Sequence, residues 1–150
     1  MEEKRTILLV EDNPDDVELT LRALKQYHVR NEVTVVRDGA EALDYLLATG
    51  AYADRDTSAM PAVVILDLKL PKVDGLEVLQ RMRADERTKF VPVVVLTSSK
   101  EEKDMVNSYK FGANSYVQKP VDFTQFVEAA RQLGLYWLVI NEPPPRLRRT

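Results

Sequence analysis

Short apolar segments alternate with longer amphipathic segments along this 150-residue chain, and this alternation restricts the folds that it can adopt. The apolar segments are Ile7–Val10, Val33–Val36, Val63–Leu66, Val91–Leu96 and Tyr116–Val117. Except for the last, which is too short to assign by composition, they are rich in Val, Ile and Leu and contain few charges. This composition is typical of strands buried on both faces of a parallel sheet.

Between these segments the apolar residues recur about every 3.6 positions, which predicts helices. Asn13 is expected to cap the first helix, and Pro14 suits its first turn. The expected apolar faces are Val17, Leu21, Leu24 and His28; Ala40, Leu43 and Leu47; Leu76, Leu79 and Met82; Met105 or Val106 with Tyr109; and, from Asp122, Phe123, Phe126, Val127, Ala130, Leu133, Trp137 and Ile140.

Strand and helix therefore alternate five times, which predicts an α/β fold. We expect one five-stranded parallel sheet flanked by five helices, with right-handed crossovers. The length suits a single domain over residues 1–142. Residues 48–60 are expected to form a long polar connection, and residues 143–150, with three prolines and three arginines, are expected to form an extended tail.

Composition excludes several classes of protein. Lys and Arg number 21 against 24 for Asp and Glu, a net charge of −3, so no general attraction to nucleic acid or anionic membranes is expected. The absence of cysteine excludes disulfides, thiolate nucleophiles and cysteine-ligated metals, and one histidine cannot form a polyhistidine site. With no secretory signal, and no apolar run near the roughly 20 residues of a membrane span, the chain is expected to be cytoplasmic.

Polar side chains follow four of the predicted strands. Glu11 and Asp12 follow the first, Asp67 the third, Thr97 the fourth and Lys119 the fifth. Ligands of such sheets bind at the carboxyl ends of the strands, where these groups should meet. Three carboxylates there would repel one another unless they shared a cation, and Mg²⁺ is the hard divalent ion that suits oxygen ligands.

Each residue also has an ordinary structural explanation. An Asp after a strand is commonly a turn former or helix cap, and a Lys is commonly a solvated surface charge. The whole set at consecutive strand ends favours a functional site over these separate explanations. Lys119 and the Thr97 hydroxyl could there hold phosphate oxygens beside the metal ion.

Four segments carry a family resemblance: ILLVEDN at 7–13, LDLKLP at 66–71 with Asp74-Gly75, VLTSS at 95–99 and YVQKP at 116–120. Together they resemble the receiver domains of two-component response regulators, over about residues 5–140. DNPDD at 12–16, the long connection and the YW…NEPPP ending resemble the single-domain response regulators of bacterial and cyanobacterial phytochromes. The resemblance implies the flavodoxin-like (βα)5 receiver architecture.

The resemblance also implies a role for each site residue. Asp67 would be the phosphoacceptor, and Mg²⁺ would be held by Glu11, Asp12, Asp67 and the main-chain carbonyl of Lys69. Lys119 and Thr97 would bind phosphoryl oxygens. Thr97 would then move inward, and Tyr116 would turn into the space behind it, as the receiver switch requires. The Lys119-Pro120 bond would be cis, as is usual in receivers.

The implied partner is a histidine kinase that phosphorylates Asp67, and the narrower resemblance points to a kinase of the phytochrome type. With no second domain expected, output would pass through another protein or through a homodimer formed by the fourth helix, fifth strand and fifth helix. The chain would be a signalling protein, not an enzyme, although it would assist its own phosphoryl transfer and dephosphorylation.

Two other functions compete with this interpretation. One is a phosphorylation-independent adaptor with a receiver fold, which the complete set of acids and Lys119 argues against. The other is a flavodoxin-like or nucleotide-binding enzyme. Such an enzyme needs a Gly-rich phosphate loop after the first strand, where this chain has Glu11-Asp12-Asn13-Pro14.

Overall fold

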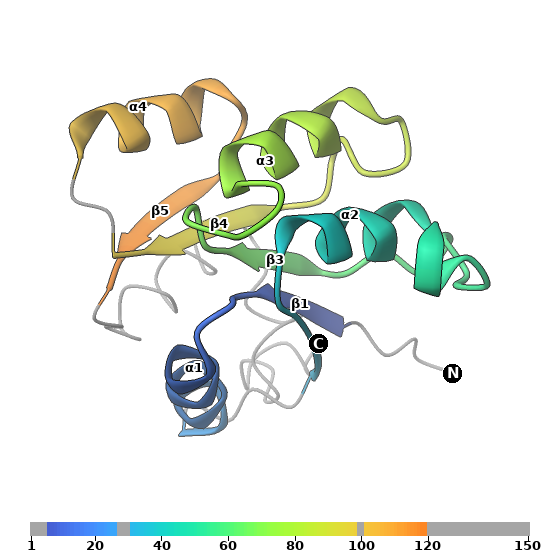
Figure 1. Cartoon of the computed structure of the whole chain (residues 1–150), viewed down its shortest axis with the longest axis horizontal. Helices are drawn as coiled ribbons and strands as arrows, with labels where there is room; N and C mark the ends of the chain where they lie inside the picture. Colours follow the sequence, from blue (N-terminus) through green and yellow to red (C-terminus); the bar gives the residue numbers. More distant parts are fainter. Residues whose placement is uncertain (1–5, 27–30, 99–100, 120–150) are drawn as a thin grey trace, which may run out of the picture.

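Five parallel strands form a single sheet in this computed structural model, which describes residues 6–26, 31–98 and 101–119. Their order across the sheet is β2-β1-β3-β4-β5; the succession from β1 through β3 and β4 to β5 can be followed in Figure 1. The bounds are β1 (Thr6–Val10), β2 (Glu32–Val36), β3 (Val63–Leu66), β4 (Val93–Thr97) and β5 (Ser115–Gln118). The parallel α/β sheet predicted from the sequence is thus confirmed.

Two of the strand predictions need correction. The fourth strand begins at Val93 rather than Val91, because Pro92 has no N–H for the ladder, although its carbonyl accepts a hydrogen bond from the Val64 N–H at 2.9 Å. β2 is not buried on both faces: it lies at the edge of the sheet, and Val33 to Val35 are only half-buried. Apolar composition alone does not distinguish an edge strand from a central one.

The first helix begins directly after Asn13, the cap predicted from the sequence. The helices are α1 (Pro14–Gln26), α2 (Gly39–Leu47), α3 (Gly75–Ala84) and α4 (Glu102–Lys110), with a short 3₁₀ helix η1 (Gly50–Tyr52) after α2. The Asn13 side chain accepts a hydrogen bond from the Asp15 N–H at 2.8 Å, and Asp38 and Asp74 cap α2 and α3 in the same way. α2, α3 and α4 cover one face of the sheet and α1 lies against the other (Figure 1).

The buried faces of two helices differ from the expected ones. In α1, Leu21 is exposed and Thr20 is buried. In α4 the three apolar residues, Met105, Val106 and Tyr109, are 41%, 53% and 49% exposed, whereas Asp104 and Ser108 are buried. The buried polar residues of α4 are stabilised by hydrogen bonding: the Ser108 hydroxyl, for example, donates to the Asp104 carbonyl at 2.7 Å.

The apolar faces predicted for α2 and α3 agree with the structure in part. In α2 the predicted Leu43 is buried, together with Ala42 and Leu46, while the predicted Ala40 and Leu47 are half-buried. In α3, Leu79 and Met82 are buried as predicted. His28, the fifth helix from Asp122, the Lys119-Pro120 bond and the tail involve residues outside the described ranges.

Alternating strand residues form an apolar core on each face of the sheet. Leu8, Val64 and Val95 pack toward α2 and α3, whereas Ile7, Ile65 and Val94 pack with Val17 and Leu24 of α1. None of the helices in the part of the chain that the structure describes has the length and apolar character needed to cross a membrane.

Arg83, near the end of α3, forms hydrogen bonds with the segments before β4 and before β5. These contacts lie at the end of the sheet where the strands begin. The guanidinium of Arg83 donates to the carbonyls of Lys89 and Val91 before β4, at 3.1 and 2.7 Å. It also donates to the Gly112 carbonyl at 2.8 Å and the Asn114 side chain at 3.1 Å, in the turn before β5. This one side chain therefore fixes the entry of both strands relative to α3.

We expect Arg83→Ala to lower the free energy of unfolding by about 2–3 kcal/mol, because part-buried carbonyls lose a charged donor. Arg81→Ala is the matched control: Arg81 lies on the same helix, half-exposed, with a single ion pair to Glu77 at 3.9 Å. Its removal should change stability by no more than about 0.5 kcal/mol. Urea unfolding followed by circular dichroism measures both, and equal effects would contradict the anchoring role.

Candidate metal and phosphoryl site

Main-chain hydrogen bonds hold the ends of the strands in register. The Glu11 N–H donates to the Val36 carbonyl at 3.0 Å, and the Asp67 N–H donates to the Val10 carbonyl at 3.1 Å. The Lys119 N–H donates to the Thr97 carbonyl at 2.8 Å. The residues that follow the strands are therefore positioned by the sheet ladder rather than by independent loops.

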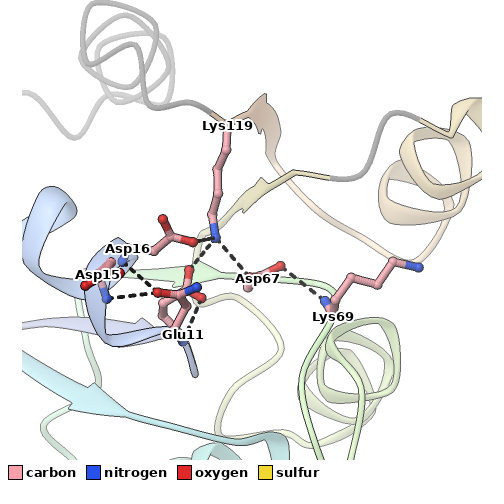
Figure 2. Close-up of polar contacts among 7 residues, drawn as sticks. Glu11, Asp15, Asp16, Asp67, Lys69 and Lys119 are labelled. Atoms are coloured by element: carbon pink, nitrogen blue, oxygen red, sulfur yellow. Dashed lines mark hydrogen bonds and ion pairs between the residues drawn. The ribbon is translucent and has the colours of Figure 1, made fainter.

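The ammonium group of Lys119 lies among three carboxylates (Figure 2). Its Nζ is 2.6 Å from Glu11 Oε1, 2.8 Å from Asp16 Oδ2 and 3.1 Å from Asp67 Oδ2. The side chains of Lys119, Glu11 and Asp67 are all less than 10% exposed. Such buried, charge-assisted hydrogen bonds offset the large cost of removing these charges from water.

Glu11, Asp12 and Asp67 form a group that could hold a metal ion. One carboxylate oxygen from each lies within 4.8 Å of the others, with Glu11 and Asp67 buried and Asp12 exposed. Hard oxygen ligands on one side, with an exposed side open to water, suit Mg²⁺, which retains several water ligands. The donor set thus fits the ion predicted from the sequence.

Burial and the neighbouring charges shift the pKa values of Glu11 and Lys119. Burial raises the pKa of Glu11 to about 7, helped by the charge of Asp67 and opposed by the hydrogen bond from Lys119. Burial by itself would lower the pKa of Lys119, but hydrogen bonds to Asp16 and Glu11 and the charge of Asp67 outweigh it and raise that pKa. A second cation at this place would favour the ionised form of Glu11.

The loop after β3 is packed closely around Asp67. Its Oδ1 accepts a hydrogen bond from the Lys69 N–H at 3.1 Å. The start of α3 lies against the main chain of Asp67. A Cβ on Gly75 would lie 2.3 Å from the Asp67 carbonyl oxygen, so only glycine fits there. From the sequence, Gly75 indicates only where a helix starts. The structure shows that it also allows α3 to lie close to the main chain of Asp67.

Thr97 and Tyr116 lie on neighbouring strands and face the same side of the sheet. Thr97, fully buried, pairs with Gln118, and Tyr116 pairs with Val95. Because pairs in register share a face and side chains alternate along a strand, Tyr116 is a diagonal neighbour of Thr97. Tyr116 is half-buried and packs against the core under α2 and α3.

Two acidic residues beside the site were not predicted from the sequence. Asp16 contacts Lys119 from the first turn of α1, and no spacing within that segment signals a partner so distant in the chain. Asp104, on α4, forms an ion pair with the Lys69 Nζ at 3.4 Å and is buried. Nothing in the local sequence pairs residues 69 and 104, which only the packing of α4 brings together.

Comparison with known proteins identifies relatives over most of the chain. The family of response regulator receiver domains matches residues 7–131. The probable methanogenesis regulatory protein FilR2 of Methanothrix harundinacea is 39% identical over 92% of this chain and 86% of its own length. The response regulator Rcp1 of Synechocystis is 36% identical over 89% of each chain.

Solved structures give the same result. The bacteriophytochrome response regulator RtBRR is 57% identical with a TM-score of 0.83, covering 95% of this chain and 86% of that one. The phosphorylated cyanobacterial phytochrome response regulator RcpA is 40% identical, with a TM-score of 0.75 and coverages of 91% and 95%. The Mn²⁺-bound form of Rcp1 is 34% identical, with a TM-score of 0.74 and coverages of 93% and 99%.

We expect the affinity for Mg²⁺ to fall about tenfold from pH 8 to pH 6, because Glu11, with a pKa of about 7 in the metal-free protein, takes up a proton and can no longer bind the ion. Isothermal titration calorimetry at the two pH values measures this change. Glu11→Gln should bind more weakly and lose most of the pH dependence. Equal affinity of the unaltered chain at both pH values would contradict the assignment.

Proposed function

This chain belongs to the family of response regulator receiver domains, which act in two-component signalling, and we propose that it accepts a phosphoryl group on Asp67. The observation that carries the proposal is the environment of the Asp67 carboxylate. It is buried, lies 3.1 Å from the Lys119 ammonium and is grouped with Glu11 and Asp12. A nucleophilic carboxylate, a fixed cation and a metal-binding pair are what phosphoryl transfer requires from a protein.

The proposed chemistry uses each of these groups. An oxygen of Asp67 attacks phosphorus in line, a new O–P bond forms as the bond to the donor's nitrogen breaks, and the leaving imidazole keeps the electron pair. Lys119 donates a hydrogen bond to a phosphoryl oxygen, and the Lys69 N–H, 3.1 Å from Asp67 Oδ1, orients the acceptor carboxylate. Mg²⁺ held by Glu11, Asp12, Asp67 and the main-chain carbonyl of Lys69 would neutralise phosphoryl charge.

The signal is proposed to leave the site through Thr97 and Tyr116. The Thr97 hydroxyl donates to another phosphoryl oxygen and moves toward it. Tyr116, its diagonal neighbour, turns into the space that Thr97 leaves, which alters the surface of α4 and β5. The shared face of the two residues and the half-buried state of Tyr116 support this step.

A histidine kinase, of the phytochrome type, is the proposed donor. RtBRR is a bacteriophytochrome response regulator, and RcpA is a phytochrome response regulator whose crystal structure is of the phosphorylated protein. Rcp1 was crystallised in a Mn²⁺-bound form, which supports a divalent ion at the matching place. We propose a cytoplasmic signalling protein that, apart from assisting its own phosphorylation and dephosphorylation, has no substrate of its own.

Incubation with acetyl phosphate and Mg²⁺ should add one phosphoryl group, detected by intact-protein mass spectrometry and removed by hydroxylamine, which cleaves acyl phosphates. Chelation of Mg²⁺ should abolish the adduct, since the site's negative charge would then repel the donor. Asp67→Asn should also abolish it. Asp85→Asn is the matched control, because Asp85 is a half-buried carboxylate away from the site that pairs with Arg87.

Failure of both acetyl phosphate and a histidine kinase to phosphorylate the folded chain would reject the proposal. The phosphorylation-independent adaptor would then be the better description. An adduct that persists in Asp67→Asn would instead show that another residue is the acceptor.

We further propose that the chain forms a homodimer through α4, β5 and the helix expected after residue 122. Among the described residues, Met105, Val106 and Tyr109 support this, because they place exposed apolar side chains along α4. The sheet does not need these residues for its core, so a partner surface can cover them.

Met105→Glu should shift the chain toward monomer in sedimentation velocity at tens of micromolar, because a charge would enter the apolar contact. Leu19→Glu is the control, since Leu19 is 51% exposed on α1, on the opposite face of the sheet. Monomer at every concentration, with and without phosphorylation, would refute the dimer.

A further inference from the structure

We propose that Asp16 is a positioning residue that competes with the phosphoryl group for the ammonium of Lys119. The inference rests on the proposed phosphorylation of Asp67 and adds a residue that sets its rate. Asp16 would hold Lys119 in the resting state and release it when a phosphoryl oxygen arrives.

The ammonium of Lys119 has a limited number of hydrogen-bond donors. A lysine ammonium has three N–H groups. In the resting structure three carboxylates lie within hydrogen-bonding distance: Glu11 at 2.6 Å, Asp16 at 2.8 Å and Asp67 at 3.1 Å. A phosphoryl oxygen can therefore gain a hydrogen bond from Lys119 only if one of these contacts is given up (Figure 2).

The three carboxylates differ in how readily they can leave the ammonium. The side chains of Glu11 and Asp67 are 3% and 8% exposed, whereas that of Asp16 is 32% exposed. A carboxylate that leaves an ammonium must be solvated, and the exposed one regains water at the smallest cost. Asp16 is therefore the partner that Lys119 can exchange most readily.

The carboxylates also differ in their relation to the metal ion. Glu11 and Asp67 are both in the group that fits Mg²⁺, while Asp16 is outside it. If Asp16 were neutral, Lys119 would be held by Glu11 and Asp67 alone, and would compete more strongly with the ion for these two carboxylates. Asp16 thus holds the Lys119 ammonium beside the site and weakens its interaction with Glu11 and Asp67, the two carboxylates that the metal ion needs.

This competition predicts two opposite effects of Asp16→Asn. The affinity for Mg²⁺ should fall about threefold or more. At saturating Mg²⁺, the initial rate of phosphorylation by acetyl phosphate should rise about threefold or more, because a phosphoryl oxygen no longer displaces a carboxylate from Lys119.

Asp15→Asn is the matched control for both measurements. Asp15 precedes Asp16 in the first turn of α1, is exposed, and its substitution removes the same charge from the same helix N-terminus. Calorimetric titration with Mg²⁺ and the initial rate of adduct formation are compared among the unaltered chain, Asp15→Asn and Asp16→Asn. Circular dichroism verifies that all are folded.

A Lys119→Met background tests whether Asp16 acts through Lys119. In that background Asp16→Asn and Asp15→Asn should have equal Mg²⁺ affinities, because the ammonium for which Asp16 competes is gone. A merely structural or long-range charge effect of Asp16 would persist there.

Equal behaviour of Asp16→Asn and Asp15→Asn, slower phosphorylation of Asp16→Asn, or an affinity difference that survives in Lys119→Met would each overturn the proposal. An unaltered chain that binds Mg²⁺ but accepts no phosphoryl group would reject the phosphoryl-acceptor function alone. The Mg²⁺ titrations would in that event still decide whether Asp16 controls Lys119.

Discussion

The ammonium group of Lys119 is the contact on which the candidate site depends. It neutralises part of the charge that β1, β3 and the start of α1 bring to one edge of the sheet, and it joins residues more than a hundred positions apart in the chain. Without it, Glu11, Asp16 and Asp67 would face one another as buried or half-buried carboxylates, an arrangement that costs several kcal/mol per uncompensated charge. Burial is the main reason that the pKa of Glu11 is raised, so the hydrogen bond from one ammonium only partly offsets the cost of keeping this carboxylate from water.

The sheet supplies the rigidity that such a site needs. Glu11, Asp67 and Lys119 each donate a main-chain hydrogen bond to the neighbouring strand, so their backbones continue the ladder beyond the last strand residue. Groups held in this way need little reorganisation when charge develops, which is how a protein contributes to phosphoryl transfer. The paired strands β4 and β5 place Thr97 and Tyr116 as diagonal neighbours on one face of the sheet, which is the arrangement that the proposed switch uses.

In α4 polar residues are buried and apolar residues are exposed, the opposite of what their polarity predicts. Asp104 and Ser108 are buried because the ion pair with Lys69 and a hydrogen bond within the helix satisfy them. The apolar residues Met105 and Tyr109 face outward as a consequence. In this family member, the helix that the proposed switch would affect is thus linked to the loop after Asp67 and also carries exposed apolar side chains.

The sequence by itself determined the parallel sheet, the Asn13 cap of α1 and the end of the sheet at which Glu11, Asp12 and Asp67 meet. Strand composition, helical period and an Asx cap are local properties, and the carboxyl ends of parallel strands coincide. Only the tertiary structure decided that β2 is an edge strand, that the apolar side of α4 is exposed, and that Asp16 shares Lys119 with the other carboxylates. These features depend on which elements become neighbours and on how a long side chain reaches across them. Neither is encoded in the spacing of residues along one segment.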